Sequence, residues 1–230
     1  MTKNISVILS VFNGENHVAN SIESILNQTH ENFELLILDD ASTDNTYKIM
    51  KSYANKDTRM NLYKNSSNIG LTKCLNFLIS KSNFDYIARQ DADDLSLTER
   101  FSNQIKAFEF GDYDAVTTRA IIREENSFTP NYSYYIPRKI IMKIKNPFIH
   151  GSLMIKKNVL QKLGNYNENF YYAQDYKLMN DLIKKNYKTK ILKEPLYVLN
   201  QKNNISTNFK NSQEYFANCV KKNIDPEINI

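Results

Sequence analysis

The sequence predicts an α/β fold in which a mostly parallel central sheet carries helices on both faces. Short apolar runs alternate along the first half of the chain with segments whose apolar residues recur every three or four positions. The apolar runs are rich in β-branched residues and hardly interrupted by polar ones, which is typical of parallel strands buried on both faces.

The expected elements follow in a regular order. Strands are expected at residues 5–12, 33–38, 60–63 and 86–88. Between them, apolar spacing predicts helices that start near Val18, near Tyr47 and near Leu71. The segment Ser96-Leu97-Thr98-Glu99 has the form of a capping box and predicts a further helix through Phe108.

Regularity weakens after a further expected strand at residues 115–123. Residues 126–147 carry three prolines and are typical of a surface excursion. The remaining elements are a strand at 152–155, a helix at 159–163 that Gly164 ends, a helix after Asp175 and a strand at 189–192. We expect one domain over residues 1–202, made of two parts at about 1–123 and about 124–202. A loose, polar, helical tail is expected at 203–230.

Composition restricts the class of protein. The chain has 230 residues, no apolar run of transmembrane length and strand-like sequence close to its N-terminus, so we expect no signal peptide. Cys74 and Cys219 make no disulfide framework, which favours a reducing, cytoplasmic setting, and Cys74 is expected to be a packed thiol. The net charge of +5 comes from lysines concentrated in the second half; they suit anionic lipid, phosphorylated substrates or nucleic acid, or form a solvated face.

Three carboxylates, Asp91, Asp93 and Asp94, follow the fourth expected strand within four positions. Charges this close repel one another, and Mg²⁺ or Mn²⁺ beside a substrate phosphate would relieve the repulsion, although an acidic turn in solvent is the alternative. Asn13 and the pair Asp39-Asp40 also follow strands. Because the carboxyl ends of parallel strands meet at one edge of a sheet, we expect all these residues to converge there.

Two common nucleotide folds are excluded by the glycines. The turn after the first strand, residues 11–16, holds one glycine where a Rossmann dehydrogenase needs several, and the chain has no Gly-Lys-Ser/Thr ending of a P-loop. A haloacid-dehalogenase phosphatase places its Asp-x-Asp after the first strand, not the fourth. A bound diphosphate would therefore need a metal for neutralisation, and the acidic cluster is the expected place.

Seven segments, in this order and spacing, resemble family-two glycosyltransferases of the GT-A fold. They are 6–13 (SVILSVFN), 24–29 (SILNQT), 33–44 (FELLILDDASTD), 68–73 (NIGLTK), 88–94 (ARQDADD), 146–155 (NPFIHGSLMI) and 173–176 (AQDY). The resemblance covers roughly residues 4–200 and is strongest to bacterial transferases that build lipooligosaccharide or capsule. It implies a GT-A fold with a nucleotide-sugar half, about 1–123, and a smaller acceptor half, about 124–202.

The resemblance also implies roles for individual residues in binding a UDP-sugar donor. Ser10, Asn13 and Asp40 match the positions that hold uracil and ribose, and Lys73 would meet a phosphate. Arg89 and Gln90 would flank the donor, with Arg89 pairing the aspartates as an alternative role. Two of these residues have a structural alternative: Asp40 could be an acid at a helix N-terminus, and Lys73 an ordinary exposed lysine.

The reaction implied is an inverting transfer that uses a metal and a base. Asp91 is expected to touch ribose or metal, and Asp93 to coordinate Mn²⁺ or Mg²⁺ directly. Asp175 matches the family's general base, with a helix N-terminal acid as the alternative. His150 is expected to face the donor phosphate or the acceptor, and Tyr171 and Tyr172 to stack on sugar rings or to pack in the core.

One departure from the family pattern affects the end of the domain. Leu199 and Gln201 stand where related enzymes often carry an arginine and a histidine, and Lys202 is a candidate for the missing charge. A catalytically silent nucleotide- or sugar-binding module is therefore the second reading. Binding of nucleic acid through lysines and tyrosines is the third, and the acidic edge argues against it. The expected partners are a nucleotide-sugar donor and a glycan acceptor, lipid-linked or not, reached from the cytoplasm or from the cytoplasmic face of the inner membrane.

Overall fold

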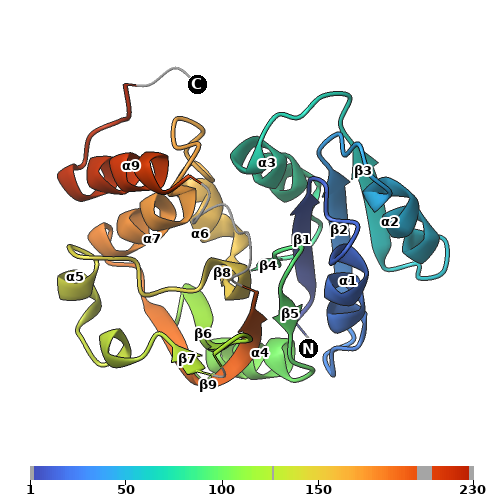
Figure 1. Ribbon diagram of the computed structural model, residues 1–230. Helices are drawn as coiled ribbons and strands as arrows, with labels where there is room; N and C mark the ends of the chain where they lie inside the picture. The colour runs from blue at the N-terminus through green and yellow to red at the C-terminus, as the bar shows by residue number, and fades with distance from the viewer. Residues whose placement is uncertain (1–2, 126, 201–208, 228–230) are drawn as a thin grey trace.

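The computed structural model describes residues 3–125, 127–200 and 209–227 and has the predicted α/β architecture (Figure 1). One curled sheet runs through the molecule in the order β3-β2-β1-β4-β8-β6-β9-β5, and β7 pairs with β6 outside this path. The prediction of a mostly parallel sheet with helices on both faces is confirmed.

The first half is a parallel βα unit. Its strands are β1 (Ile5–Val11), β2 (Phe33–Asp39), β3 (Met60–Lys64) and β4 (Tyr86–Arg89), and its helices are α1 (Val18–Leu26), α2 (Thr46–Ala54) and α3 (Leu71–Lys81). β1 pairs in parallel with β2 and β4, and β2 with β3. Every residue of β2 is buried, as its continuous apolar sequence predicts.

The second half joins this sheet through an antiparallel pair between β4 and β8. Its strands are β5 (Leu95–Ser96), β6 (Ala115–Ile122), β7 (Ser127–Thr129), β8 (Met154–Lys156) and β9 (Thr189–Leu199). Its helices are α4 (Arg100–Phe110), α5 (Arg138–Ile141), α6 (Lys157–Lys162), α7 (Gln174–Lys184) and α9 (Lys210–Lys222), with short 3₁₀ turns η1 (Tyr132–Tyr134) and η2 (His150–Ser152). β9 is longer than the predicted strand because it stays paired with β6 through Leu199, past an irregularity beside Arg119.

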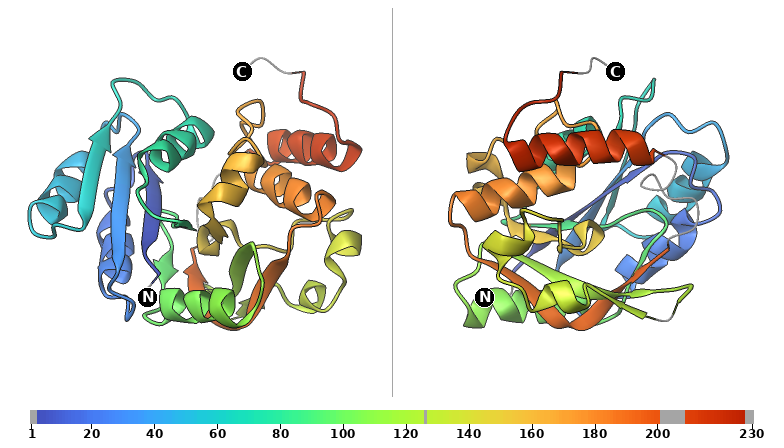
Figure 2. Two further views of the ribbon diagram at one scale, coloured as in Figure 1. Left: turned by 180° about the vertical axis from the view of Figure 1, so that it is seen from behind. Right: turned by 60° about the vertical axis from the view of Figure 1, so that its left-hand side comes forward.

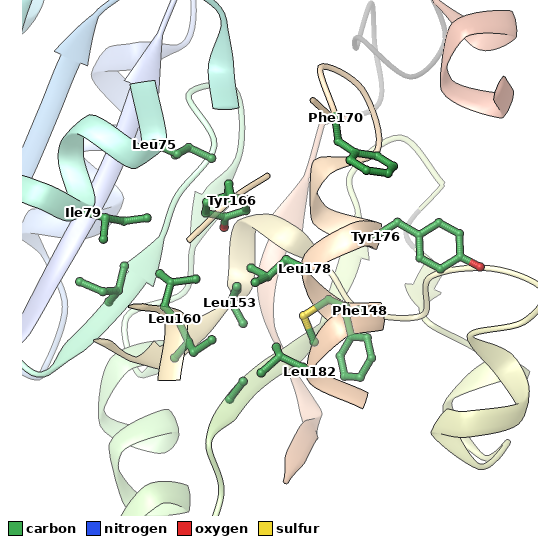
Figure 3. Packing of buried hydrophobic residues seen from close by; sticks show 14 of the residues in the cluster. Leu75, Ile79, Phe148, Leu153, Leu160, Tyr166, Phe170, Tyr176, Leu178 and Leu182 are labelled. Atoms are coloured by element: carbon green, nitrogen blue, oxygen red, sulfur yellow. The ribbon is translucent and has the colours of Figure 1, made fainter. Parts of the chain in front are cut away.

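Two hydrophobic cores lie on opposite faces of the sheet. One packs α1, α2 and α4 against alternate residues of β1 and β2. The other packs α3, α6, α7 and α9 against the remaining residues of those strands and against β8. Figure 3 shows this second core, where Leu75 and Ile79 of α3 belong to the same cluster as Leu178 and Leu182 of α7. This second core contains residues from both halves of the chain and so holds the two halves together.

The predicted capping box is wrong. Ser96 belongs to β5, and its Oγ donates a hydrogen bond to Gln90 Oε1 at 2.7 Å rather than capping a helix. α4 begins at Arg100 after Glu99, with no side-chain cap. Pairing with β9 draws Ser96 into the sheet, so a tertiary contact overrides the local signal.

The predicted C-terminal helix is present as α9, but it is packed against the domain rather than loose. Phe216, Cys219 and Val220 are buried in the second core, and α9 lies beside α7 (Figures 1 and 2). Cys74 is also buried, and burial raises the pKa of its thiol to about 12, as expected of a packed cysteine. In the part of the chain that is described, no helix combines the length and the apolar character needed to cross a membrane.

Candidate active site

A cavity of about 410 Å³ opens where the two halves meet beyond β4. The loop after β4 supplies three carboxylates to it, and η2, the start of α7, the end of β9 and α9 supply the other walls. The polar lining residues are Asp91, Asp93, Asp94, His150, Gln174, Asp175, Asn200 and Gln213. The predicted acidic cluster and the predicted base therefore line one space.

The three carboxylates of the loop differ in their environments. Arg89, which is buried, pairs with Asp91 at 2.5 Å between Nη2 and Oδ1, as one of its two predicted roles requires. Asp94 is buried and accepts a hydrogen bond from the Asn200 N–H at 2.8 Å; burial and its acidic neighbours raise the pKa of Asp94 to about 8. Burial and the charge of Asp91 also raise the pKa of Asp93. Among the described residues, no other residue donates a hydrogen bond to the Asp93 carboxylate, which lines the cavity.

A buried polar network holds this loop from beneath. Gln90 Nε2 donates to the carbonyl oxygens of Asp91 and Asp94, at 3.1 and 2.9 Å. Gln90 Oε1 accepts from Arg100 Nη1 at 3.0 Å, and Arg100 Nη2 donates to the Arg89 carbonyl at 2.6 Å. Gln90 has no exposed surface, so its side chain cannot contact a donor in the cavity, and the prediction of that contact is wrong. Its amide positions the acidic loop instead.

We expect Arg100→Met to lower the free energy of unfolding by about 3–5 kcal/mol, because it leaves buried acceptors such as Gln90 Oε1 without their donor. Arg100 is fully buried, and burial lowers the pKa of its guanidinium to about 10. Chemical denaturation checks the prediction. Arg123→Met, at an exposed position after β6, is the control and should change the unfolding free energy by less than about 0.5 kcal/mol. Equal effects of the two substitutions would contradict the network's role.

The opposite wall of the cavity carries Asp175 and His150. Asp175 lies in the first turn of α7, and its Oδ2 accepts a hydrogen bond from Asn146 Nδ2 at 2.9 Å. His150 Nε2 lies 2.8 Å from Tyr166 Oη. Burial, and then the charge of Arg89, lower the pKa of His150, while burial raises the pKa of Tyr166. His150 is thus a neutral, oriented imidazole at the cavity wall.

Aromatic side chains border the cavity beside Asp175. Tyr171 and Tyr172 meet edge to face with ring centroids 5.1 Å apart, and Tyr172 also contacts Phe209 at 5.5 Å. Tyr171 packs on Gly70, where an added Cβ would lie 2.7 Å from Tyr171 Cε2. Tyr171 is 43% exposed, so its ring presents surface to the cavity as well as packing.

The other predicted donor residues lie outside the cavity lining. Asp40 is buried, and its carboxylate accepts hydrogen bonds from the Ile69 and Gly70 N–H groups, both at 2.9 Å, and from Asn65 Nδ2 at 2.8 Å. Asp40 therefore fixes the loop that leads into α3.

Asn13, Ser10 and Lys73 occupy three different environments. Asn13 is exposed, with a φ of 50°, and its Oδ1 accepts from the Thr43 N–H at 2.9 Å. This bond links the loops after β1 and β2. Ser10 is half-buried on the α3 side of β1, and Lys73 is exposed on α3. The structure places these three residues along the edge of the sheet but not around the 410 Å³ cavity.

Sequence reasoning missed Asn200, Gln213 and Arg100. Asn200 directly follows β9, and its backbone N–H donates a hydrogen bond to Asp94 across 106 positions of sequence. Gln213 reaches the cavity from the helix predicted as a loose tail. No local pattern signals such contacts. Leu199 lines the cavity, whereas Gln201 and Lys202 lie outside the described residues, as do residues 203–208 of the predicted tail.

Comparison with known proteins gives a consistent result. Residues 6–164 match glycosyl transferase family 2. The chain is 38% identical to EpsE of Bacillus subtilis over 70% of this chain and 59% of EpsE. It is 36% identical to the O-antigen biosynthesis glycosyltransferase WbnJ of Escherichia coli over 76% of this chain and 69% of WbnJ.

Two solved structures share the fold. S. aureus TarS, residues 1–349 in complex with UDP-GlcNAc, has a TM-score of 0.74 at 18% identity and covers 87% of this chain and 59% of its own. The mannosyltransferase PcManGT of Pyrobaculum calidifontis, in complex with GDP-Man and Mn²⁺, has a TM-score of 0.75 at 16% identity and covers 98% of this chain and 66% of its own. The curled α/β sheet has the GT-A form of these neighbours. On the extent of the family match and the identity to WbnJ, the chain belongs to glycosyl transferase family 2.

Proposed function

We propose that the protein is a metal-dependent inverting transferase that moves a hexose or N-acetylhexosamine from a UDP-sugar to a glycan acceptor in the synthesis of surface polysaccharide or lipooligosaccharide. The observation that carries the proposal is that the Asp93 carboxylate, to which no other described residue donates a hydrogen bond, lines the same cavity as the Asp175 carboxylate. The match to WbnJ supports the pathway class, and TarS with UDP-GlcNAc supports the donor class.

The residues of the acidic loop fit a divalent cation. Among the described residues, no other residue donates a hydrogen bond to the Asp93 carboxylate, and Asp91 forms an ion pair with Arg89. Within the described ranges, no group of three or more His, Cys, Asp or Glu side chains is arranged to hold a metal. Asp93 and Asp91 would hold Mn²⁺ or Mg²⁺, and a bound donor would have to supply further oxygen ligands for such an ion. When bound, such an ion stabilises the charge that develops on the leaving nucleotide.

Asp175 is the proposed general base. An inverting transfer needs a carboxylate that takes the proton from the acceptor hydroxyl as this hydroxyl attacks the sugar. Asn146 holds one oxygen of Asp175 and leaves the other for that proton. Neutral His150 would orient the donor or the acceptor beside it, and the exposed ring of Tyr171 would stack on a sugar.

The remaining donor contacts are proposed for the sheet edge. Asn13 and Ser10 would meet the nucleoside, and Lys73 a phosphate. Asp40 already receives three hydrogen bonds, so its contribution would come through the loop at residues 65–70 that it fixes, with any remaining lone pair free for a uracil N–H.

We expect Gly151→Ala to lower transferase activity at least tenfold and the free energy of unfolding by about 1–3 kcal/mol. The added Cβ would lie 2.1 Å from Tyr197 Oη and 2.5 Å from Asp91 Oδ2, so the acidic loop must move. Gly164→Ala is the control. It meets no atom within 4 Å but has a φ of 87°, so it should cost about 1 kcal/mol of stability and leave activity intact. Unchanged activity in Gly151→Ala would contradict the role of the loop geometry.

A hydrolysis and transfer screen of sugar nucleotides, with Mn²⁺ or Mg²⁺ present, tests the proposal. Turnover of a UDP-sugar that stops when the metal is chelated supports it. Binding of UDP without turnover of any donor would favour the second candidate, a catalytically silent module. The reason for considering that candidate is Gln201, which stands where related enzymes often carry a histidine.

For the cellular setting, we propose the cytoplasm and the cytoplasmic face of the inner membrane, without nucleic acid as a partner. Two buried free cysteines fit a reducing compartment. The acidic lining of the cavity repels a phosphate backbone that brings no metal.

A further inference from the structure

A second cavity, of about 250 Å³, lies between α5 and the C-terminal part of α7. It is lined by Lys139, Met142, Lys143, Asn180, Ile183 and Lys184. The first and second cavities share α7: Asp175 stands in the first turn of this helix, and Lys184 at its last residue, about 14 Å further along the axis.

The lysines of the second cavity are not neutralised. None of them takes part in an ion pair among the described residues; Lys139 Nζ and Lys184 Nζ donate instead to the neutral amides of Asn186 and Asn223, at 2.9 and 2.8 Å. The acid nearest in sequence, Asp181, is paired with Lys177 at 2.6 Å. Residues 126–167 contain no Asp or Glu at all. The lining of the cavity therefore includes three lysines and no acidic residue.

A buried donor also lacks a partner at this cavity. Asn180 is 7% exposed, lines the cavity, and its Nδ2 has no hydrogen-bond partner in the described part of the chain. An unpaired buried amide costs free energy, so a site that keeps one is prepared for an acceptor from outside the protein. Lysine ammonium groups and amide N–H groups both donate hydrogen bonds to phosphate oxygens, so these lining residues suit a phosphate.

The surface beside the cavity is apolar as well as basic. Ile140 and Ile144 are 55% and 62% exposed, and they alternate with Lys139, Lys143 and Lys145 around the turn that continues α5. Tyr132 and Tyr135 just before α5 are 83% and 73% exposed. Exposed isoleucines would not contribute to binding of a free phosphate. A lipid bilayer surface, in contrast, accepts isoleucine and tyrosine side chains next to lysines.

From this combination we infer that the second cavity binds the phosphate of an anionic phospholipid headgroup, and that Ile140 and Ile144 enter the membrane interface beside it. Membrane contact at the end of α7 brings the cavity that holds Asp175 close to the bilayer surface. The inference does not depend on the donor or on the metal of the proposed function.

Co-sedimentation of the full chain with vesicles tests the inference, using phosphatidylcholine alone and phosphatidylcholine mixed with phosphatidylglycerol. We expect binding only to the anionic vesicles. The double variant Lys139→Gln/Lys143→Gln should weaken that binding about 30-fold, since each lysine near the surface contributes about fivefold. Lys48→Gln/Lys51→Gln, exposed on α2 in the other half, is the charge-matched control and should bind like the wild type.

Two further variants separate the site from general attraction. Ile140→Ser/Ile144→Ser should weaken vesicle binding about tenfold with the charge unchanged. Asn180→Leu removes the unpaired donor, so vesicle binding should fall while the melting temperature stays equal or rises; a purely structural Asn180 would give a lower melting temperature.

Three outcomes would overturn the inference. Equal binding to both vesicle types would show that the anionic headgroup is not recognised. Equal losses of vesicle binding in the Lys139/Lys143 and Lys48/Lys51 variants would show that only net charge matters. Inorganic phosphate that saturates the cavity while the wild type ignores anionic vesicles would make this a site for free phosphate.

Discussion

Asp93→Asn is expected to lower the turnover of the sugar nucleotide by about 10³-fold while leaving the protein at least as stable as the wild type. Asp93 faces the cavity, and no other described residue donates a hydrogen bond to its carboxylate, so no protein contact is lost. Burial and Asp91 raise the pKa of Asp93, which means that its charge is unfavourable until a cation arrives. A substitution that lowers turnover without lowering stability is expected of a functional carboxylate, whereas loss of a structural carboxylate would lower stability.

Steady-state assays with saturating Mn²⁺ and thermal melting check this prediction together. Asp85→Asn is the matched control, because Asp85 is exposed before the amino end of β4 and makes the same change of charge. Should Asp93→Asn retain full turnover, Asp93 would be no more than an acidic residue in a turn.

Asp175→Asn is expected to reduce transfer to the acceptor by about 10²–10⁴-fold and to leave the affinity for UDP unchanged. An amide at this position keeps the hydrogen-bonding shape toward Asn146 but cannot take a proton from the acceptor hydroxyl. Because Asp175 lies across the cavity lining from the acidic loop, loss of the base should not disturb binding of the nucleotide.

Single-turnover kinetics and UDP titration separate these two effects. Asp181→Asn, six residues further along α7, breaks the pair with Lys177 and should cost less than about 1 kcal/mol of stability without loss of transfer. If Asp175→Asn transferred sugar at the normal rate, another group would have to be the base.

Most of the fold follows from local patterns. The first four strands are continuous apolar runs of a parallel sheet, and the helices between them carry apolar residues at helical spacing. The order of these elements along the chain and the approximate strand ends could therefore be predicted. Position after a strand predicts that Asp91 and Asp93 reach the edge of the sheet. The structure shows them in one cavity with Asp175.

What could not be predicted depends on contacts between distant segments. The sequence predicts Ser96 as a helix cap, but Ser96 pairs with Tyr197 in the sheet. It predicts Gln90 as a ligand of the donor, but Gln90 is buried under the acidic loop. Phe216, in a polar segment, completes a core, and Gln213 reaches the cavity from the same helix. In each case the partner lies beyond the span of a helix or turn, where sequence spacing carries no information.

Titration of UDP into the wild type and into Asp93→Asn, with and without Mn²⁺, tests the central claim most directly. We predict that Mn²⁺ tightens UDP binding to the wild type at least tenfold, or about 1.4 kcal/mol, and has no effect on Asp93→Asn. The same affinity for UDP in the wild type with and without Mn²⁺ would contradict the assignment of a metal-assisted nucleotide site to the acidic loop.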